Sequence, residues 1–206
     1  MMDQRTEQWY AARLGKVTAS RLSDVLATIK TGEAATRANY RIELVAERLT
    51  GKSTPGFTSA AMQWGVDCEP MARSAYETET GLIVTEVGFV DHPTIAMAGA
   101  SPDGLVGDDG LIEIKCPETK THIETLTSKR APAKYMPQMQ WQMACTGRAW
   151  VDFVSFDPRL PEHLMLDIIR VERDQSLIDQ YSEAVSRFLD DVYKTVEFLN
   201  TRGLTC

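Results

Sequence analysis

The feature that most limits the possible folds is a change in the spacing of apolar residues at Leu82. Before it, segments 36–50 and 59–80 carry apolar residues at helical spacing. From Leu82 onward, short segments rich in β-branched residues are bounded by turn residues, which is typical of strands. Helical spacing returns at 134–146 and 175–199. This order predicts an α/β fold in which a central mixed β-sheet is flanked by helices.

The expected elements follow from these patterns and from their end signals. We expect helices at 6–13, 19–29 (capped by Thr18), 36–50, 59–80, 134–146 and 175–199, and strands within 82–91, 94–101, 110–116, 149–157 and 163–174. Residues 51–58 read as a loop. Pro70 should kink its helix because it removes one backbone donor, and Asp108-Asp109-Gly110 predicts a tight hairpin.

Length and composition suit an ordinary globular chain. At 206 residues and 23.0 kDa, we expect one domain covering 1–206. There is no run of roughly 20 apolar residues, as a membrane span needs, and the charged N-terminus does not read as a signal peptide. We therefore expect a cytoplasmic protein with no membrane partner. The four cysteines form no C-x-x-C pair and are interpreted as reduced thiols rather than zinc or iron–sulfur ligands.

The charge balance is uneven along the chain. The net charge is −7, which by itself disfavours a nucleic-acid partner. Residues 1–52, however, carry nine Lys/Arg against six Asp/Glu, whereas the remainder carries 13 against 23. Segment 115–134 is also locally positive. An acidic body with two basic segments can bind DNA on one face, but scattered solvated charges would give the same counts.

The stretch from Ser101 to Pro117 brings unlike charges into a short space. Alternate side chains of a strand share a face, so Glu113 and Lys115 lie together while their apolar neighbours point the other way. Asp103 stands at the other end of the expected hairpin and can approach Glu113 across the strands. Two carboxylates suit Mg²⁺, and an ammonium can orient a metal-bound water or stabilise charge on a phosphate. Taken alone, the pattern also fits a salt-bridged hairpin.

Four separated sequence blocks resemble one protein family. They are W-x3-R-L-G-x-V-T-A-S, W-G-x3-E, S-P-D-G followed by E-I-K-C-P, and Y-M-x-Q-x-Q, beginning at Trp9, Trp64, Ser101 and Tyr135. In this order they resemble the PD-(D/E)xK nuclease superfamily, and within it the phage lambda exonuclease or YqaJ-like viral recombinase family. The resemblance covers nearly the whole chain and implies the PD-(D/E)xK nuclease fold.

The resemblance assigns roles to residues that match the family's motifs. Asp103 and Glu113 match its metal-binding carboxylates, with the main-chain carbonyl of Ile114 as a further ligand. Lys115 matches its catalytic lysine. Glu69 matches an additional acidic residue at the metal site, although the bare pattern also fits an exposed helix carboxylate.

Further assignments concern the water and the DNA end. Gln138 matches a glutamine that helps to place the nucleophilic water or scissile phosphate, with Gln140 as the alternative. Arg13, Ser20 and Ser101 match residues that receive a 5′-terminal phosphate. A guanidinium grips phosphate through two hydrogen bonds and hydroxyls can donate to it, but Ser20 equally fits a helix cap.

The first and second blocks each begin with a tryptophan, for which a structural role is the simpler interpretation. Trp9 and Trp64 could stack on bases, but buried core positions are the expectation for both.

The resemblance implies a Mg²⁺-dependent exonuclease that uses two ions, with Mn²⁺ as a possible substitute. It would digest linear double-stranded DNA from a 5′-phosphorylated end to 5′-mononucleotides. A homotrimeric ring and a single-strand annealing partner in phage recombination are also implied. Two alternatives remain open: an endonuclease of the same superfamily, and a non-catalytic protein that binds DNA ends.

Overall fold

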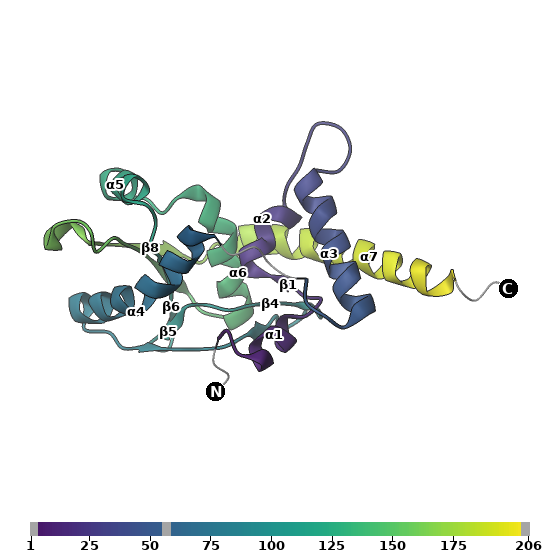
Figure 1. The fold of residues 1–206 in the computed structure, drawn as a ribbon, viewed down its shortest axis with the longest axis horizontal. Coiled ribbons are helices and arrows are strands. Elements are labelled where there is room, and N and C mark those ends of the chain that lie inside the picture. The colour runs from purple at the N-terminus through teal and green to yellow at the C-terminus, as the bar shows by residue number, and fades with distance from the viewer. Residues whose placement is uncertain (1–3, 55–58, 203–206) are drawn as a thin grey trace.

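The computed structural model describes residues 4–54 and 59–202 and has a mixed α/β fold, as predicted (Figure 1). The α-helices are α1 (Glu7–Arg13), α2 (Leu22–Val25), α3 (Ala35–Thr50), α4 (Ala60–Thr80), α5 (Thr119–Ser128), α6 (Met136–Thr146) and α7 (Gln175–Thr201). The strands are β1 (Val17–Thr18), β2 (Val84–Thr85), β3 (Val90–Asp91), β4 (Ala98–Ala100), β5 (Gly104–Val106), β6 (Gly110–Lys115), β7 (Trp150–Phe156) and β8 (Leu166–Glu172). Short 3-10 segments lie at Ala19–Arg21, Ala133–Tyr135 and Glu162–Leu164.

The strands of the described chain form two sheets. The larger has the order β2-β5-β6-β7-β8, in which β6 is parallel to β7 and the other neighbours are antiparallel. This confirms the predicted mixed sheet. A smaller sheet, β1-β4-β3, receives the strand expected within 94–101. The chain therefore crosses from the small sheet to the large one between Ala100 and Gly104.

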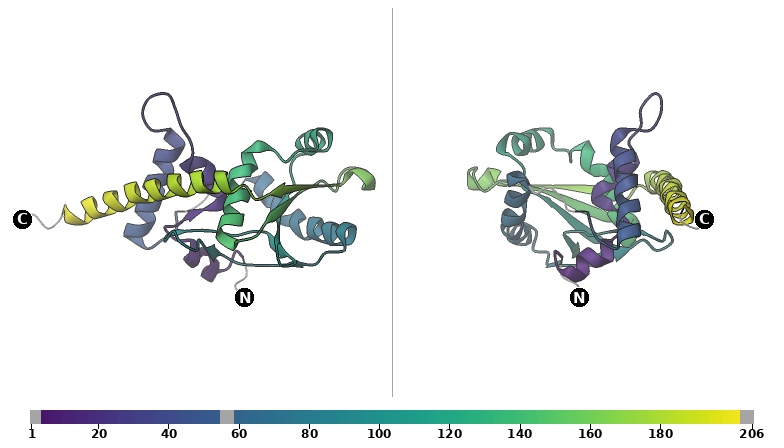
Figure 2. Two further views of the ribbon diagram at one scale, coloured as in Figure 1. Left: turned by 180° about the vertical axis from the view of Figure 1, so that it is seen from behind. Right: turned by 45° about the vertical axis from the view of Figure 1, so that its right-hand side comes forward.

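Helices cover both faces of the large sheet (Figures 1 and 2). On one face, α4 encloses an apolar cluster that includes Ile112 and Ile114 of β6. On the other, α2, α3, α6 and α7 contribute to a larger cluster that reaches Leu111 of β6. Strand β6 lies inside the sheet and between these layers, which explains why its side chains are almost all buried.

Most helix ends lie close to the capping residues and glycines that predicted them. Gly81 and Gly147 end α4 and α6 in the left-handed conformation, with φ of 69° and 73°, which glycine adopts at little cost. Ser59 and Asp174 accept hydrogen bonds from backbone N–H groups in the first turns of α4 and α7. Helix α4 continues through Pro70.

The expected helix over 19–29 is wrong in extent. The structure has a 3-10 turn followed only by α2, which ends at Val25. Thr18 does not cap it, because Thr18 belongs to β1 and pairs with Gly99. Its backbone N–H donates to the Tyr40 hydroxyl at 3.2 Å, so Thr18 is held by tertiary contacts.

Other segments add detail that the patterns did not predict. Helix α5 occupies a stretch for which no element was expected, and β5 is a short strand that forms the first arm of the hairpin with β6. Part of the expected 51–58 loop, residues 55–58, lies outside the described residues. Cys68, Cys116 and Cys145 are buried and free, while Cys206 lies outside the described residues.

In the part of the chain that the structure describes, no helix is both long and apolar enough to cross a membrane.

Candidate active site

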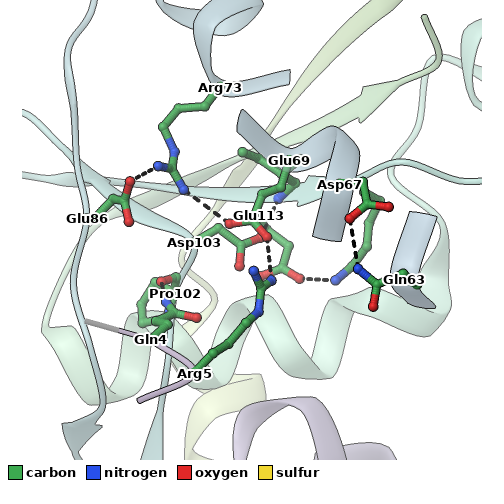
Figure 3. A network of polar contacts seen from close by, with 12 residues as sticks. Gln4, Arg5, Gln63, Asp67, Glu69, Arg73, Glu86, Pro102, Asp103 and Glu113 are labelled. Atoms are coloured by element: carbon green, nitrogen blue, oxygen red, sulfur yellow. Dashed lines mark hydrogen bonds and ion pairs between the residues drawn. The ribbon is translucent and has the colours of Figure 1, made fainter. Parts of the chain in front are cut away.

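The central acidic and basic residues meet at the carboxyl end of β6. Pairing of Gly104 with Ile112 places Asp103 beside Glu113, as the hairpin predicted. The backbone N–H of Ile114 donates to Asp103 Oδ2 at 2.7 Å, and the Lys115 ammonium forms an ion pair with Glu113. Figure 3 shows the carboxylates of Asp103 and Glu113 turned toward one another.

Helix α6 fixes the orientation of Glu113. Gln138 Nε2 donates to Glu113 Oε1 at 2.6 Å, and Gln142 Nε2 donates to Oε2 at 2.5 Å. Gln140 points elsewhere: its amide binds the carbonyl of Glu172 and the N–H of Asp174, both at 2.8 Å. Of the two glutamines considered from sequence, Gln138 therefore contacts this site.

Gln142 was not predicted, although its spacing carried a usable signal. Residues four apart lie on one face of a helix, whereas residues two apart do not. Gln138 and Gln142 therefore share a face of α6, and Gln140 lies on another. Helical geometry therefore separates the two candidates, but only the tertiary contacts show which face of α6 meets Glu113.

In the central group, which consists of Asp103, Glu113 and Lys115, the pKa values of Asp103 and Lys115 reflect burial and the close approach of charged side chains. Burial raises the pKa of Asp103 well above its usual range, and Glu113 and Glu69 raise it further, while Lys115 opposes them. For Lys115, burial lowers the pKa, but the neighbouring carboxylates Glu113 and Asp103 outweigh it and the net pKa is raised. Lys115 is thus held as an ammonium ion.

Glu69 approaches the same group from α4 (Figure 3). It accepts from Arg5 at 2.8 Å and from Arg73 at 3.1 Å. The segment carrying Arg5 is tied down by Gln4, whose amide donates to the carbonyls of Val87 and Pro102. Arg5 was not predicted, because no motif pointed to it.

The central group fits a hard cation with few protein ligands. The described residues contain no cluster of three His, Cys, Asp or Glu side chains arranged to hold a metal, and Glu69 is engaged by two arginines. Asp103 and Glu113 nevertheless supply adjacent carboxylate oxygens whose mutual repulsion raises the pKa of Asp103. This donor set suits Mg²⁺, which prefers oxygen ligands and usually keeps several waters.

The predicted phosphate-binding residues are partly brought together. Arg13 Nη1 donates to the Ser101 hydroxyl at 3.1 Å, and Trp9 Nε1 donates to the same oxygen at 2.9 Å. The Arg13 guanidinium also stacks on the Trp9 ring, 4.1 Å from its centroid. Ser20 is exposed and its hydroxyl lies 3.4 Å from that of Thr18, so no hydrogen bond links it to the Arg13–Ser101 pair within the described chain.

The expectation that both tryptophans are core residues is wrong. Trp9 and Trp64 are only partly buried, and an arginine side chain lies over each ring.

A cleft of about 730 Å³ opens beside the acidic group. The residues lining it include Arg5, Trp64, Glu69, Asp103, Ile114, Lys115, Pro117, Tyr135 and Arg159. The cleft therefore combines carboxylates with three cationic side chains and an aromatic wall. Such a combination can hold a cation and a phosphate together and can exclude much of the surrounding water.

Comparison with known families identifies the chain. A model of the YqaJ-like viral recombinase domain matches residues 8–149. The chain belongs to this family. The match spans the Asp103, Glu113 and Lys115 motif as well as the first, second and fourth sequence blocks.

Solved structures agree with this family membership. An alkaline exonuclease from Laribacter hongkongensis is 54% identical, with a TM-score of 0.89, over 97% of this chain and 98% of that chain. The structure of that exonuclease in complex with dAMP matches over the same shares with a TM-score of 0.91. A phage-related exonuclease from Haemophilus somnus 129PT, 19% identical, shares the fold with a TM-score of 0.72 over 89% of this chain and 96% of that chain. A search of curated proteins found no match.

Proposed function

We propose that this protein is a Mg²⁺-dependent exonuclease that digests linear double-stranded DNA from the 5′ end. It releases 5′-mononucleotides and leaves a 3′ single-stranded overhang, which a strand-annealing protein uses in phage recombination. The observation that carries this proposal is the meeting of Asp103, Glu113 and Lys115 beside the cleft, which Asp103 and Lys115 line. Ser101, which accepts a hydrogen bond from Arg13, lies two residues before Asp103. The homologous exonuclease that was solved with dAMP, a nucleoside monophosphate, supports the product.

Asp103, Glu113 and the carbonyl of Ile114 would hold the metal. When bound, Mg²⁺ supplies a Lewis acid and an activated water for phosphodiester hydrolysis. Gln138 and Gln142 hold both oxygens of Glu113 in place, so that carboxylate needs little reorganisation. Lys115, kept as an ammonium, is suited to stabilise negative charge on the phosphate rather than to remove a proton.

The Arg13–Ser101 pair supports recognition of the DNA end. Arg13 donates only one hydrogen bond to Ser101 in the described structure, which leaves other guanidinium N–H groups for a phosphate. Stacking on Trp9 limits the freedom of the guanidinium. A 5′-phosphate in this pocket would place the first linkage of the strand near Asp103.

The decisive experiment uses linear duplexes with 5′-phosphate or 5′-hydroxyl ends beside a covalently closed circle, each with and without Mg²⁺. Mononucleotides released only from linear DNA, only with metal and faster from phosphorylated ends are expected. Asp103→Ala should abolish release while the protein stays folded, and Arg13→Ala should reduce the preference for phosphorylated ends. Cutting of the circle would indicate an endonuclease, and no cutting of either substrate would favour an end-binding protein without activity.

A further inference from the structure

One ion pair at the cleft makes no contact with Asp103, Glu113 or Lys115 among the described residues. Asp157, which is fully buried, accepts from Arg159 Nε at 2.6 Å and from Nη2 at 3.0 Å. The backbone N–H of Arg159 also donates to Asp157. Burial raises the pKa of Asp157, but hydrogen bonds from Arg159 and Thr119 outweigh it and lower the pKa to about 2. The pair is therefore ionised throughout the physiological range.

The Arg159 guanidinium is held in place, yet part of it remains available. Its Nη2 donates to the Pro117 carbonyl at 3.0 Å, and its Cζ lies 4.8 Å from the centre of the Trp64 ring. Nη1 has no acceptor among the described residues, and 45% of the side chain is exposed. A guanidinium fixed on one edge loses little freedom when its other edge binds an anion.

The sheet topology locates Arg159 relative to the acidic group. Strand β7 runs parallel to β6 with Lys115 opposite Ser155, so Asp157 follows β7 next to Pro117, which follows β6. Strand β5 lies on the other side of β6 and runs antiparallel to it, so Asp103 and the preceding Ser101 approach the same end of β6 from that side. Ser101, which contacts Arg13, and Arg159 therefore approach the carboxyl end of β6 from the β5 side and the β7 side, respectively.

A second arginine–aspartate pair, in the large sheet, serves as a control for effects on stability alone. Arg170 grips buried Asp152 through Nε at 2.9 Å and Nη2 at 3.0 Å, lies over Trp150, and is 46% exposed. It does not line the cleft. The two pairs are alike in chemistry, and the cleft position is what distinguishes Arg159.

We propose that Arg159 binds the phosphodiester on the 3′ side of the scissile bond, in the strand being digested. The inference rests on the proposed function, which sets the direction of the strand. With the 5′-phosphate at Arg13 and the first linkage at Asp103, the strand continues 3′ toward the β7 side of the sheet. The free Nη1 of Arg159 then faces the second linkage, and Arg159 keeps the next nucleotide in the cleft after each cleavage.

The test uses 5′-phosphorylated duplexes in which one linkage of the digested strand is an uncharged methylphosphonate. The substituted linkage is either the second from the 5′ end or one far inside the duplex. Release of the first nucleotide is followed in Mg²⁺ at increasing protein concentration, which gives an apparent Kd and a maximal rate. Wild type, Arg159→Ala and the matched control Arg170→Ala are compared.

The neutral second linkage should weaken the apparent Kd of wild type about tenfold, the effect of losing one charge-assisted hydrogen bond. Arg159→Ala should start about tenfold weaker and show no further loss with that linkage. Arg170→Ala should behave as wild type. The distant methylphosphonate should affect none of them.

Because Arg159→Ala leaves Asp157 buried without its main partner, Arg159→Gln serves as a second variant that keeps an N–H donor without the charge. The inference is overturned if folded Arg159→Ala or Arg159→Gln remains as sensitive to the second neutral linkage as wild type. A wild type that releases no nucleotide from the unmodified duplex would instead contradict the proposed function.

Discussion

At the scale of single residues, the pKa values of Asp103 and Asp157 are shifted in opposite directions. Asp103 shares its surroundings with Glu113 and Glu69, so burial and repulsion together raise its pKa. Asp157 is fully buried, but the Arg159 guanidinium faces it and the net pKa of Asp157 falls. Burial raises the pKa of both carboxylates, so their charged neighbours account for the opposite net shifts.

Replacing Asp157 tests this difference through stability. Its pKa is lower in the folded protein than in the unfolded chain, so the pair stabilises the fold above the ordinary aspartate pKa and stops doing so as pH falls through about 2. Asp157→Asn should lower the free energy of unfolding by about 2 kcal/mol at pH 7. Denaturant unfolding at pH 7, 4 and 3 should show the difference shrinking below about pH 4. A difference that is constant with pH would contradict the account.

The glutamines of α6 give a second residue-scale prediction. Gln138→Ala removes a donor to Glu113 and should reduce nuclease activity about tenfold to a hundredfold with little change in stability. Gln140→Ala removes contacts to Glu172 and Asp174 and should cost about 1–3 kcal/mol of stability while activity per folded molecule is kept. Activity assays and thermal unfolding of both variants separate the roles, and a reversed pattern would refute the assignment.

At the scale of elements, the site depends on how three strands are joined. Antiparallel β5 and parallel β7 bring Asp103 and Asp157 to the same end of β6. The alternation along β6 predicted that Glu113 and Lys115 share a face, because a strand repeats every two residues. The pairing of β6 with β7 was not predictable in the same way, because it joins segments about 40 residues apart in sequence.

The close fit of β4 gives an element-scale prediction. A Cβ at Gly99 would meet the Phe89 ring and lie 2.5 Å from the carbonyl oxygen of Val90, so β3 and β4 would have to separate. Gly99→Ala should destabilise the protein by about 1–3 kcal/mol, as overpacking does. Gly65→Ala is the matched control, because a Cβ there meets nothing within 4 Å inside α4 and should be neutral or stabilising. Equal thermal unfolding temperatures for Gly99→Ala and wild type would contradict this.

At the scale of the whole molecule, α7 extends away from the sheets toward its C-terminal end (Figures 1 and 2). Its inner stripe, with Val185, Phe188 and Val192, belongs to the large apolar cluster. Farther along, Tyr193 and Phe198 are 59% and 60% exposed. Large aromatic side chains exposed on a projecting helix are suited to contact another chain.

The homotrimeric ring remains a prediction at this scale. Light scattering should give three times the 23.0 kDa of one chain at working concentration. A Tyr193→Glu, Phe198→Glu double variant should lower the mass if this surface is the contact, because burying the added charges is costly. A wild-type mass equal to one chain would refute the trimer.

The sequence by itself determined the nature of the elements and the composition of the central site. Strand and helix periods, glycine helix ends and the order of the four blocks rest on local geometry or on motif resemblance, and both are readable along the chain. The positions of Asp103, Glu113 and Lys115 followed from one short hairpin, in which all three residues are close in sequence.

The tertiary structure alone decided the surroundings of that site. Thr18 joined a strand instead of capping a helix because Gly99 lies beside it, and Trp9 and Trp64 are only partly buried. The contacts of Arg5 with Glu69 and of Arg159 with Pro117 join segments that are 64 and 42 residues apart. Such contacts depend on how the layers pack, and no local period or propensity encodes them.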